Sequence, residues 1–370
     1  MAKFPLRASE PVHGWILLAL LAAALFFVPM PQWAIEQYYS RDTYPWMQNW
    51  MTTVSNVLPI AALDLLIAGV GLLVLFRVLR LLSSVFQRGL IDATWESIRR
   101  LIRGVAVVAI LFMWTWGCNY RRQPLEQGLP GGTAVRPSVE ALTTAVADAN
   151  AMASALRPRV VADRELSFVQ TAASLAEPMD QALVSLNQPK LMKPGRPKFS
   201  VLLTPFFTWA GVNGMVNPFI LESIVHPDLL PFERPFVLAH EWAHLAGHAD
   251  EAEASAIGWL ACMRGTAPLA YSANLYLIME AGGALPPDDR RKAFAGLDSG
   301  VRTDLNAIAQ RREKEDPRVQ KAATRVYDEY LRANHVADGT ASYSRALRLI
   351  LSPPLRDALS DAKVAPNRRK

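Results

Sequence analysis

The stretch PFVLAHEWAHLAGHADEAEAS, residues 235–255, carries the pattern that decides how this chain folds and which chemistry it supports. It contains His240-Glu241-Trp-Ala-His244. On a helix, positions i and i+4 lie on one face, so both imidazoles can bind a single metal ion. Glu241, the next residue round the helix, can then contact a water molecule held by that ion. This spacing is typical of sites in which Zn²⁺ lowers the pKa of its water to about 7 and a glutamate accepts the proton.

The residues that precede the pattern fit a helix. Pro235 suits the first turn, where its missing N–H costs no hydrogen bond. Residues 236–239 are apolar and predict a buried flank that leads into the two histidines. The alternative interpretation is an ordinary amphipathic helix with solvated histidines and a surface glutamate. We favour metal binding because the pattern and its context agree.

A zinc site of this kind needs a third protein ligand, and three acids compete for that role. Gly247 can end the first helix in a left-handed turn and let the chain fold back. Without that break, Glu251 would lie roughly 10 Å from His244 along one continuous helix, too far to share an ion. With the break, Asp250, Glu251 and Glu253 open a second helix. The residues alone leave the choice among these acids open, since each also suits a helix N-terminus.

Composition separates the chain into two regions. It has 370 residues, 51% of them apolar, and a formal net charge of +6. Apolar residues are concentrated in the first third, whereas proline and charge increase after about residue 120. The early arginines lie beside apolar segments, which fits a membrane orientation better than nucleic-acid binding. Cys118 and Cys262 are too few for a disulfide framework and are expected to stay unpaired.

Three apolar segments predict transmembrane helices at about residues 14–30, 57–76 and 102–118. Arginines between the second and third segments place that connection, with the N-terminus, on the cytoplasmic side. We therefore expect a multi-pass protein of the cytoplasmic (inner) membrane with the chain after Cys118 outside. Residues 31–56 are rich in tryptophan and tyrosine and are expected to form an interfacial loop. Asp64 lies in the second segment near its outer end, where an interfacial role is favoured over a transport role.

Residues 1–123 are predicted to form the membrane domain, and residues 124–370 an extracytoplasmic soluble domain. The soluble part combines several helices with two short strands at 199–203 and 214–220, an α+β and mostly helical arrangement. A proline in the second strand suits the edge of a sheet. An exposed edge before a zinc-binding helix can bind an extended peptide as an added strand, and a core hairpin without such binding is the alternative.

Several segments give the chain a likeness to a known family. They are Trp116-Gly-Cys-Asn-Tyr120, residues 240–247, Glu251-Ala-Glu-Ala-Ser255 and residues 327–343. The chain resembles a family of uncharacterised bacterial membrane proteins with three N-terminal transmembrane helices and an external gluzincin-like (zincin-like) zinc-peptidase domain. In gluzincins the second helix supplies a glutamate ligand and, four residues later, a polar residue that orients a ligating histidine. The resemblance thus implies Glu251 as the third ligand and Ser255 as the orienting residue.

The prediction that follows is a membrane-anchored zinc metallopeptidase that hydrolyses peptide bonds outside the cytoplasmic membrane. His240, His244 and Glu251 are the predicted Zn²⁺ ligands. Glu241 is the predicted general base, which accepts a proton from water and returns it to the leaving amine. The predicted partners are a peptide or protein substrate and the lipid bilayer, without nucleic acid.

Other functions remain open at this point. One alternative is a non-catalytic membrane protein whose zinc site is structural or binds a partner. Another is a zinc hydrolase of a non-peptide amide, such as a cell-wall crosslink. A transporter formed by the spans would depend on Asp64. His335 or Tyr343 is a candidate for stabilising an oxyanion in a hydrolase.

Overall fold

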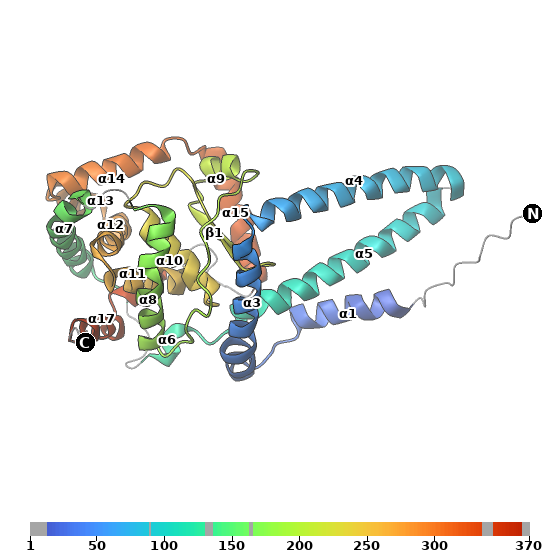
Figure 1. Ribbon diagram of the computed structural model, residues 1–370, viewed down its shortest axis with the longest axis horizontal. Coiled ribbons are helices and arrows are strands. Elements are labelled where there is room, and N and C mark those ends of the chain that lie inside the picture. The colour runs from blue at the N-terminus through green and yellow to red at the C-terminus, as the bar shows by residue number, and fades with distance from the viewer. Residues whose placement is uncertain (1–12, 89, 130–135, 163–165, 335–342, 365–370) are drawn as a thin grey trace, which may run out of the picture.

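The protein consists of a globular body from which three helices project side by side (Figure 1). The structure is a computed structural model that describes residues 13–88, 90–129, 136–162, 166–334 and 343–364. Over these residues the chain is mostly helical, and its strands form a single two-stranded sheet. The prediction of a mostly helical chain with few strands is therefore confirmed.

The projecting helices are α1 (His13–Phe27), α4 (Ala62–Arg88) and α5 (Leu90–Thr115), and α5 contacts both of the others. Of the helices described, α4 is by itself long and apolar enough to cross a bilayer, over Ala62–Gln87. α1 meets the same criteria only together with the segment Gln32–Val57, to which it is bent by 102°. The described part of the chain therefore has one helix, or two, of membrane-spanning length and composition.

Residues 31–56, predicted as a loop, are helical instead. They form most of α2 (Gln32–Ala34), the π-helical segment η1 (Ile35–Thr43) and α3 (Tyr44–Val57). The reason is tertiary, because α3 buries one face, including Tyr44 and Met47, against the body. The abundance of aromatic residues on both faces hides this helical period in the sequence. The second apolar helix consequently starts later than predicted, at Ala62 rather than near residue 57.

The helices of the body surround a large apolar core. They are α6 (Leu125–Gly128), α7 (Val139–Ala162), α8 (Phe168–Ser185), α9 (Thr204–Ala210), α10 (Arg234–Leu245), α11 (Glu251–Met263), α12 (Ala267–Ala284), α13 (Pro287–Ala295), α14 (Ser299–Arg312), α15 (Pro317–Ala333), α16 (Tyr343–Ile350) and α17 (Pro353–Val364), and the 3-10 helix η2 (Gly117–Arg121) follows α5. α10 and α11 lie in the centre, where Trp242, Ile257 and Leu260 are fully buried. A helix that is apolar on most sides needs such surroundings.

The sheet lies next to α10. β1 (Gly214–Asn217) pairs antiparallel with β2 (Glu222–Val225), with Met215 opposite Ile224. Residues 199–203, predicted as a strand, instead form a turn that leads into α9, which has a proline in its first turn. The prediction missed β2 because it is buried on both faces, so polar and apolar residues do not alternate along it.

Segments from the predicted membrane domain pack into the body. Gln48 Nε2 in α3 donates to the Lys193 carbonyl oxygen at 2.6 Å. Thr52 Oγ1 donates to the Leu221 carbonyl oxygen at 2.7 Å. Residues on both sides of the predicted boundary at 123/124 thus share one packed unit, and experiments need the full chain.

A buried ion pair lies where the sheet meets the base of α4. Lys198 Nζ lies 3.0 Å from Glu222 Oε2, and the two side chains are 2% and 1% exposed. The Glu222 carboxylate also accepts hydrogen bonds from the N–H groups of Ala62 and Leu63, at 2.9 and 2.7 Å. A negative charge at this position satisfies the first turn of α4.

Replacing Lys198 with Met leaves the Glu222 carboxylate buried without its cation. We expect this change to lower the free energy of unfolding by about 3–5 kcal/mol. Chemical denaturation of the full-length protein in detergent measures the loss. The double variant Lys198→Met, Glu222→Gln should recover part of it, and a single variant as stable as wild type would contradict the expectation.

Candidate metal centre

Two helices joined by a tight turn carry the candidate site. α10 has Pro235 in its first turn and ends at Leu245, and Gly247 follows with a φ of 92°. This left-handed conformation suits glycine, which lacks a Cβ. A Cβ at Gly247 would also lie 3.0 Å from the ring of Tyr44. The prediction that Gly247 ends the first helix is confirmed.

The second helix begins at the acids that follow. Asp250 is the N-cap of α11, and its carboxylate accepts hydrogen bonds from the N–H groups of Ala252 and Glu253 at 3.0 and 3.2 Å. α11 approaches α10 closely at Gly258, where a Cβ would lie 2.9 Å from the backbone nitrogen of His240. This approach packs α11 against the part of α10 that carries the histidines.

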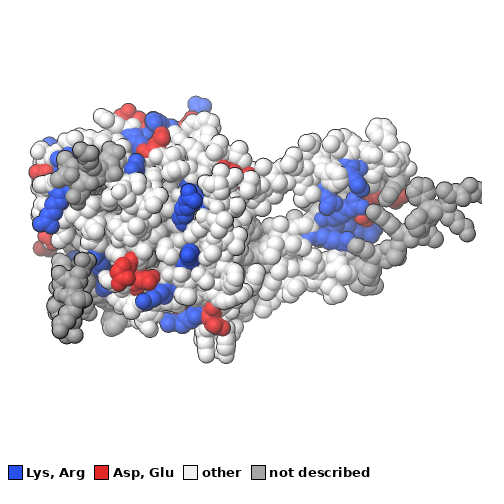
Figure 2. All heavy atoms as spheres, viewed as in Figure 1, with Lys and Arg blue, Asp and Glu red and all other residues white. Residues whose placement is uncertain are grey.

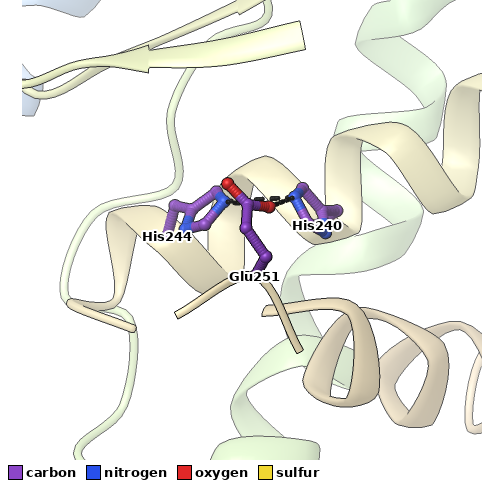
Figure 3. A group of neighbouring side chains, drawn as sticks. All are labelled: His240, His244 and Glu251. Atoms are coloured by element: carbon purple, nitrogen blue, oxygen red, sulfur yellow. Dashed lines mark hydrogen bonds and ion pairs between the residues drawn. The ribbon is translucent and has the colours of Figure 1, made fainter. Parts of the chain in front are cut away.

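The side chains of His240, His244 and Glu251 converge on one point (Figure 3). The two Nε2 atoms are 3.1 Å apart. Glu251 Oε2 lies 3.1 Å from His240 Nε2 and 3.5 Å from His244 Nε2. In a tetrahedral zinc site with bonds of about 2.0–2.1 Å, ligand atoms are about 3.3 Å apart. The three atoms therefore have the spacing of one face of such a tetrahedron.

Hydrogen bonds to the outer ring nitrogens orient the two imidazoles. His244 Nδ1 lies 2.7 Å from the carbonyl oxygen of His248, which can only accept, so Nδ1 carries the proton. In the neutral ring, Nε2 then carries no proton, and its lone pair faces the cluster. Ser255 Oγ lies 3.2 Å from His240 Nδ1, a contact that the family resemblance implied. Such outer contacts are typical of metal-binding histidines.

One oxygen of the Glu251 carboxylate accepts a hydrogen bond, and the other does not. Its Oε1 accepts a hydrogen bond from the hydroxyl of Tyr327 in α15. Its Oε2 is buried and accepts no hydrogen bond of suitable geometry from the part of the chain that the structure describes. A carboxylate oxygen that faces two imidazole nitrogens at these distances needs a proton or a cation between them. The ligand atoms and their surroundings therefore fit a zinc ion.

The electrostatics of the cluster also favour a cation. Burial raises the pKa of Glu241 to about 8. Burial, the largest single cause, acts to lower the pKa of His244. The charge and hydrogen bond of Glu251, with smaller contributions from Glu241 and the His248 carbonyl, together outweigh burial and raise that pKa to about 9. Burial acts to raise the pKa of Glu251, yet His244 and His240 hold it well below its usual value. The buried carboxylates thus draw positive charge onto His244, whereas burial lowers the pKa of His240. A bound dication can supply that positive charge instead.

Glu241 lies beside the cluster, between α10 and β1. Its carboxyl group packs against the first residue of β1, because a Cβ at Gly214 would lie 2.6 Å from Glu241 Oε1. The residue is 4% exposed, and its Oε2 accepts no hydrogen bond from the described residues. A carboxylate placed in this way is available to accept a proton from a water molecule in the site.

The other acids that the sequence leaves as candidate ligands have different partners. Asp250 caps α11 and forms an ion pair with Arg345. Glu253 accepts a backbone hydrogen bond at 2.7 Å, and its Oε2 lies 3.0 Å from His248 Nδ1. Glu251 is therefore the acid that the structure brings to the two histidines. Two candidates for oxyanion stabilisation lie outside the described residues, namely His335 and the side chain of Tyr343.

Three residues that lie far from residues 240–251 in the sequence also contact the site. The sequence patterns assigned no role to them. Trp116, the residue that follows α5, contacts the His244 ring edge to face with centroids 6.2 Å apart. Arg122 Nη1 donates to the Gly247 carbonyl oxygen at 3.0 Å. The Tyr327 hydroxyl donates a hydrogen bond to the Glu251 carboxylate. The segments containing Trp116 and Tyr327 carry the family resemblance, and no local pattern marks their roles.

Replacing Ser255 with Ala is expected to weaken zinc binding without abolishing it. The change removes the hydrogen-bonding partner of His240 Nδ1 and leaves all three candidate ligands. Loss of such an outer contact costs about 10–100-fold in metal affinity. Competition titration of the full-length protein with a zinc chelator measures the change. Ser185→Ala is the control, because that hydroxyl bonds its own helix at Ala182, and equal affinities in the two variants would contradict the expectation.

These features define a mostly helical protein with a buried His-His-Glu cluster. A family model described as "Protein of unknown function (DUF3810)" matches residues 39–351. Because the match covers most of the chain, the protein belongs to this family. The matched region runs from η1 through the candidate site to the end of α16. No curated protein and no solved structure matches the chain.

Proposed function

We propose that this protein is a membrane-anchored zinc metallopeptidase that acts outside the cytoplasmic membrane. His240, His244 and Glu251 hold the zinc ion, and Glu241 is the general base. The observation that carries the proposal is the convergence of three ligand atoms beside a buried carboxylate with an unsatisfied oxygen. A structural zinc site has no need of that fourth group, whereas hydrolysis requires it.

The chemistry divides between the metal and the chain. Bound Zn²⁺ polarises the substrate carbonyl and lowers the pKa of a water molecule. Glu241 accepts a proton from the attacking water and returns it to the leaving nitrogen. The His248 carbonyl and Ser255 hold the two rings in orientation, and Tyr327 holds the Glu251 carboxylate. Burial keeps the Glu241 carboxylate basic by disfavouring its charged form.

The sheet edge next to the general base supports a peptide substrate. β1 pairs with β2 along one edge, and no strand among the described residues pairs with its other edge. Gly214 at the start of β1 packs against Glu241. An extended peptide added to this edge passes alongside the general base, with main-chain hydrogen bonds that do not depend on its sequence.

The projecting helices support the membrane anchor. We assign α1, α4 and α5 as three transmembrane helices, with the N-terminus in the cytoplasm and the body outside. Large apolar side chains are exposed along all three helices. Figure 2 shows basic atoms gathered toward the end far from the body, with an uncharged band between. The later part of α4 contains Arg77 and Arg80, and the first half of α5 contains Arg99 and Arg100. Their position fits a cytoplasmic interface at that end.

A cleavage assay on the full-length protein in lipid nanodiscs tests the proposal. A mixture-based peptide library is the substrate, and mass spectrometry detects the new peptide ends. We expect cleavage that a chelator stops, that added Zn²⁺ restores, and that is lost in His244→Ala. Folded wild-type protein that binds no zinc would overturn the proposal. Bound zinc without cleavage of any peptide would favour a structural or partner-binding site instead.

A further inference from the structure

α3 has two contrasting faces. Its buried positions, which pack against the body, are Tyr44, Met47, Gln48, Thr52 and Ser55. The other side exposes Trp46, Trp50, Val54 and Val57, which are 60%, 57%, 58% and 77% exposed. Steps of four, four and three residues place these side chains on one stripe of a helix. The sequence of α3 contains no charged residue.

The direction of α3 suits a helix that lies flat on a bilayer. The segment Gln32–Val57, which includes α3, is bent by 102° relative to Gly14–Phe27 of α1. If α1 follows the membrane normal, this segment runs nearly parallel to the membrane plane. Figure 1 shows α3 at the boundary between the body and the projecting helices. Because its buried side faces the body, its apolar stripe faces away from it.

A second apolar surface lies beside the first turn of α4, the helix that follows α3. Asp64, in the first turn of α4, accepts hydrogen bonds from the Val201 N–H at 2.7 Å and from the Ser200 hydroxyl. This contact holds Val201 and Leu202, which are 79% and 51% exposed, beside the point where α4 leaves the body. Two separate segments therefore present apolar side chains at the base of the projecting helices. The contact also gives Asp64 a structural role that requires no transport.

We propose that the apolar stripe of α3, together with Val201 and Leu202, lies in the outer leaflet at the boundary between headgroups and acyl chains. Tryptophan prefers this region because its ring is apolar and its N–H is polar. A helix with one apolar face binds there through the apolar area that it buries. Lipid is the occupant that fits, since the stripe is continuous with helices whose own exposed side chains are apolar.

This placement fixes the distance of the candidate metal centre from the membrane surface. The Tyr44 hydroxyl donates to the carbonyl oxygen of Leu245, the residue after His244, at 3.2 Å. One packed layer, roughly 8–10 Å, thus separates the axis of α3 from the end of α10 that carries His244. An extended chain covers that distance in about three residues. The substrates, on the proposed function, are therefore juxtamembrane segments of membrane-anchored polypeptides.

Spin-label depth measurements test the lipid surface independently of any zinc or activity. Single cysteines replace Val54 and Val57 on the stripe, and Val169 and Val184 on α8 as matched exposed valines, in a Cys118→Ser background. The remaining native Cys262 is fully buried. In the full-length protein in liposomes, labels at 54 and 57 should collide more often with oxygen than with a water-soluble nickel chelate. Labels at 169 and 184 should show the reverse. Aqueous behaviour at 54 and 57 would overturn the proposal.

A tethered peptide pool tests the substrate class. The same mixture-based pool is coupled to phosphatidylethanolamine through a spacer of about four or about twenty residues and added to the protein in liposomes. We expect the short-spacer pool to be cleaved about tenfold faster, since effective concentration falls steeply with linker length. Equal cleavage of both pools would overturn the juxtamembrane substrate class and leave the hydrolase standing. Cleavage of neither pool, with labels 54 and 57 in lipid, would overturn the hydrolase and leave the lipid surface standing.

Discussion

Replacement of Glu251 with glutamine is expected to release zinc from the protein. The substitution keeps the size and shape of the side chain but removes the negative charge from the cluster. A neutral amide oxygen is a weaker ligand for Zn²⁺, which takes Cys, His and carboxylate ligands. Loss of even an outer hydrogen bond costs about 10–100-fold in affinity, so loss of this ligand should exceed that range. Tyr327 would then donate to an uncharged group.

Elemental analysis of the purified full-length protein after dialysis measures this effect. Glu253→Gln is the matched control, because Glu253 lies in the same turn of α11 and its carboxylate also accepts hydrogen bonds. We expect Glu253→Gln to retain zinc at the wild-type level and Glu251→Gln to lose it. Equal zinc content in the two variants would show that Glu251 is not a ligand.

Replacement of Glu241 with glutamine is expected to leave zinc bound and to reduce peptide hydrolysis by about 10²–10⁴-fold, the usual contribution of a general base. The amide matches the carboxylate in volume, which matters because Gly214 packs closely against this side chain. It cannot accept a proton from water. Burial already raises the pKa of Glu241 to about 8, so its carboxylate is more basic than an ordinary glutamate.

Rates of library cleavage and zinc content, measured on the same preparation of Glu241→Gln, separate chemistry from binding. Ser255→Ala provides the comparison, since it should lose affinity and recover its rate when zinc is in excess. Glu241→Gln should not recover. A Glu241→Gln protein that cleaves at the wild-type rate would exclude Glu241 as the general base, and loss of zinc from it would mean that Glu241 supports the metal site structurally.

The local parts of the candidate site follow directly from residues 235–255. Helical spacing puts His240 and His244 on one face, and Gly247 ends the first helix because only glycine adopts its backbone conformation readily. Asp250 lies at the N-terminus of the second helix, a position that suits an acid, and caps it. Each of these features depends on residues within one or two turns, which is the range over which sequence patterns act.

The choice of the third acid required the packing of the two helices. Successive residues on a helix are rotated by about 100°, so Glu251 and Glu253 point in nearly opposite directions. The rotation of α11 about its axis, set by the close approach at Gly258, decides that Glu251 faces the histidines. Glu253 instead accepts a hydrogen bond from the backbone N–H of Leu125, the first residue of α6. Sequence spacing allowed both directions.

The sequence by itself thus determined a mostly helical chain, its helix-turn-helix pattern of candidate ligands and its apolar N-terminal segments. Tertiary structure alone decided that residues 31–56 are helical, that β2 rather than residues 199–203 pairs with β1, and that Trp116, Arg122 and Tyr327 surround the site. The physical reason is range. Helix periods and caps arise from neighbours along the chain, whereas the packing of α3 against the body and the contacts of Trp116 and Arg122 with the site join segments more than a hundred residues apart.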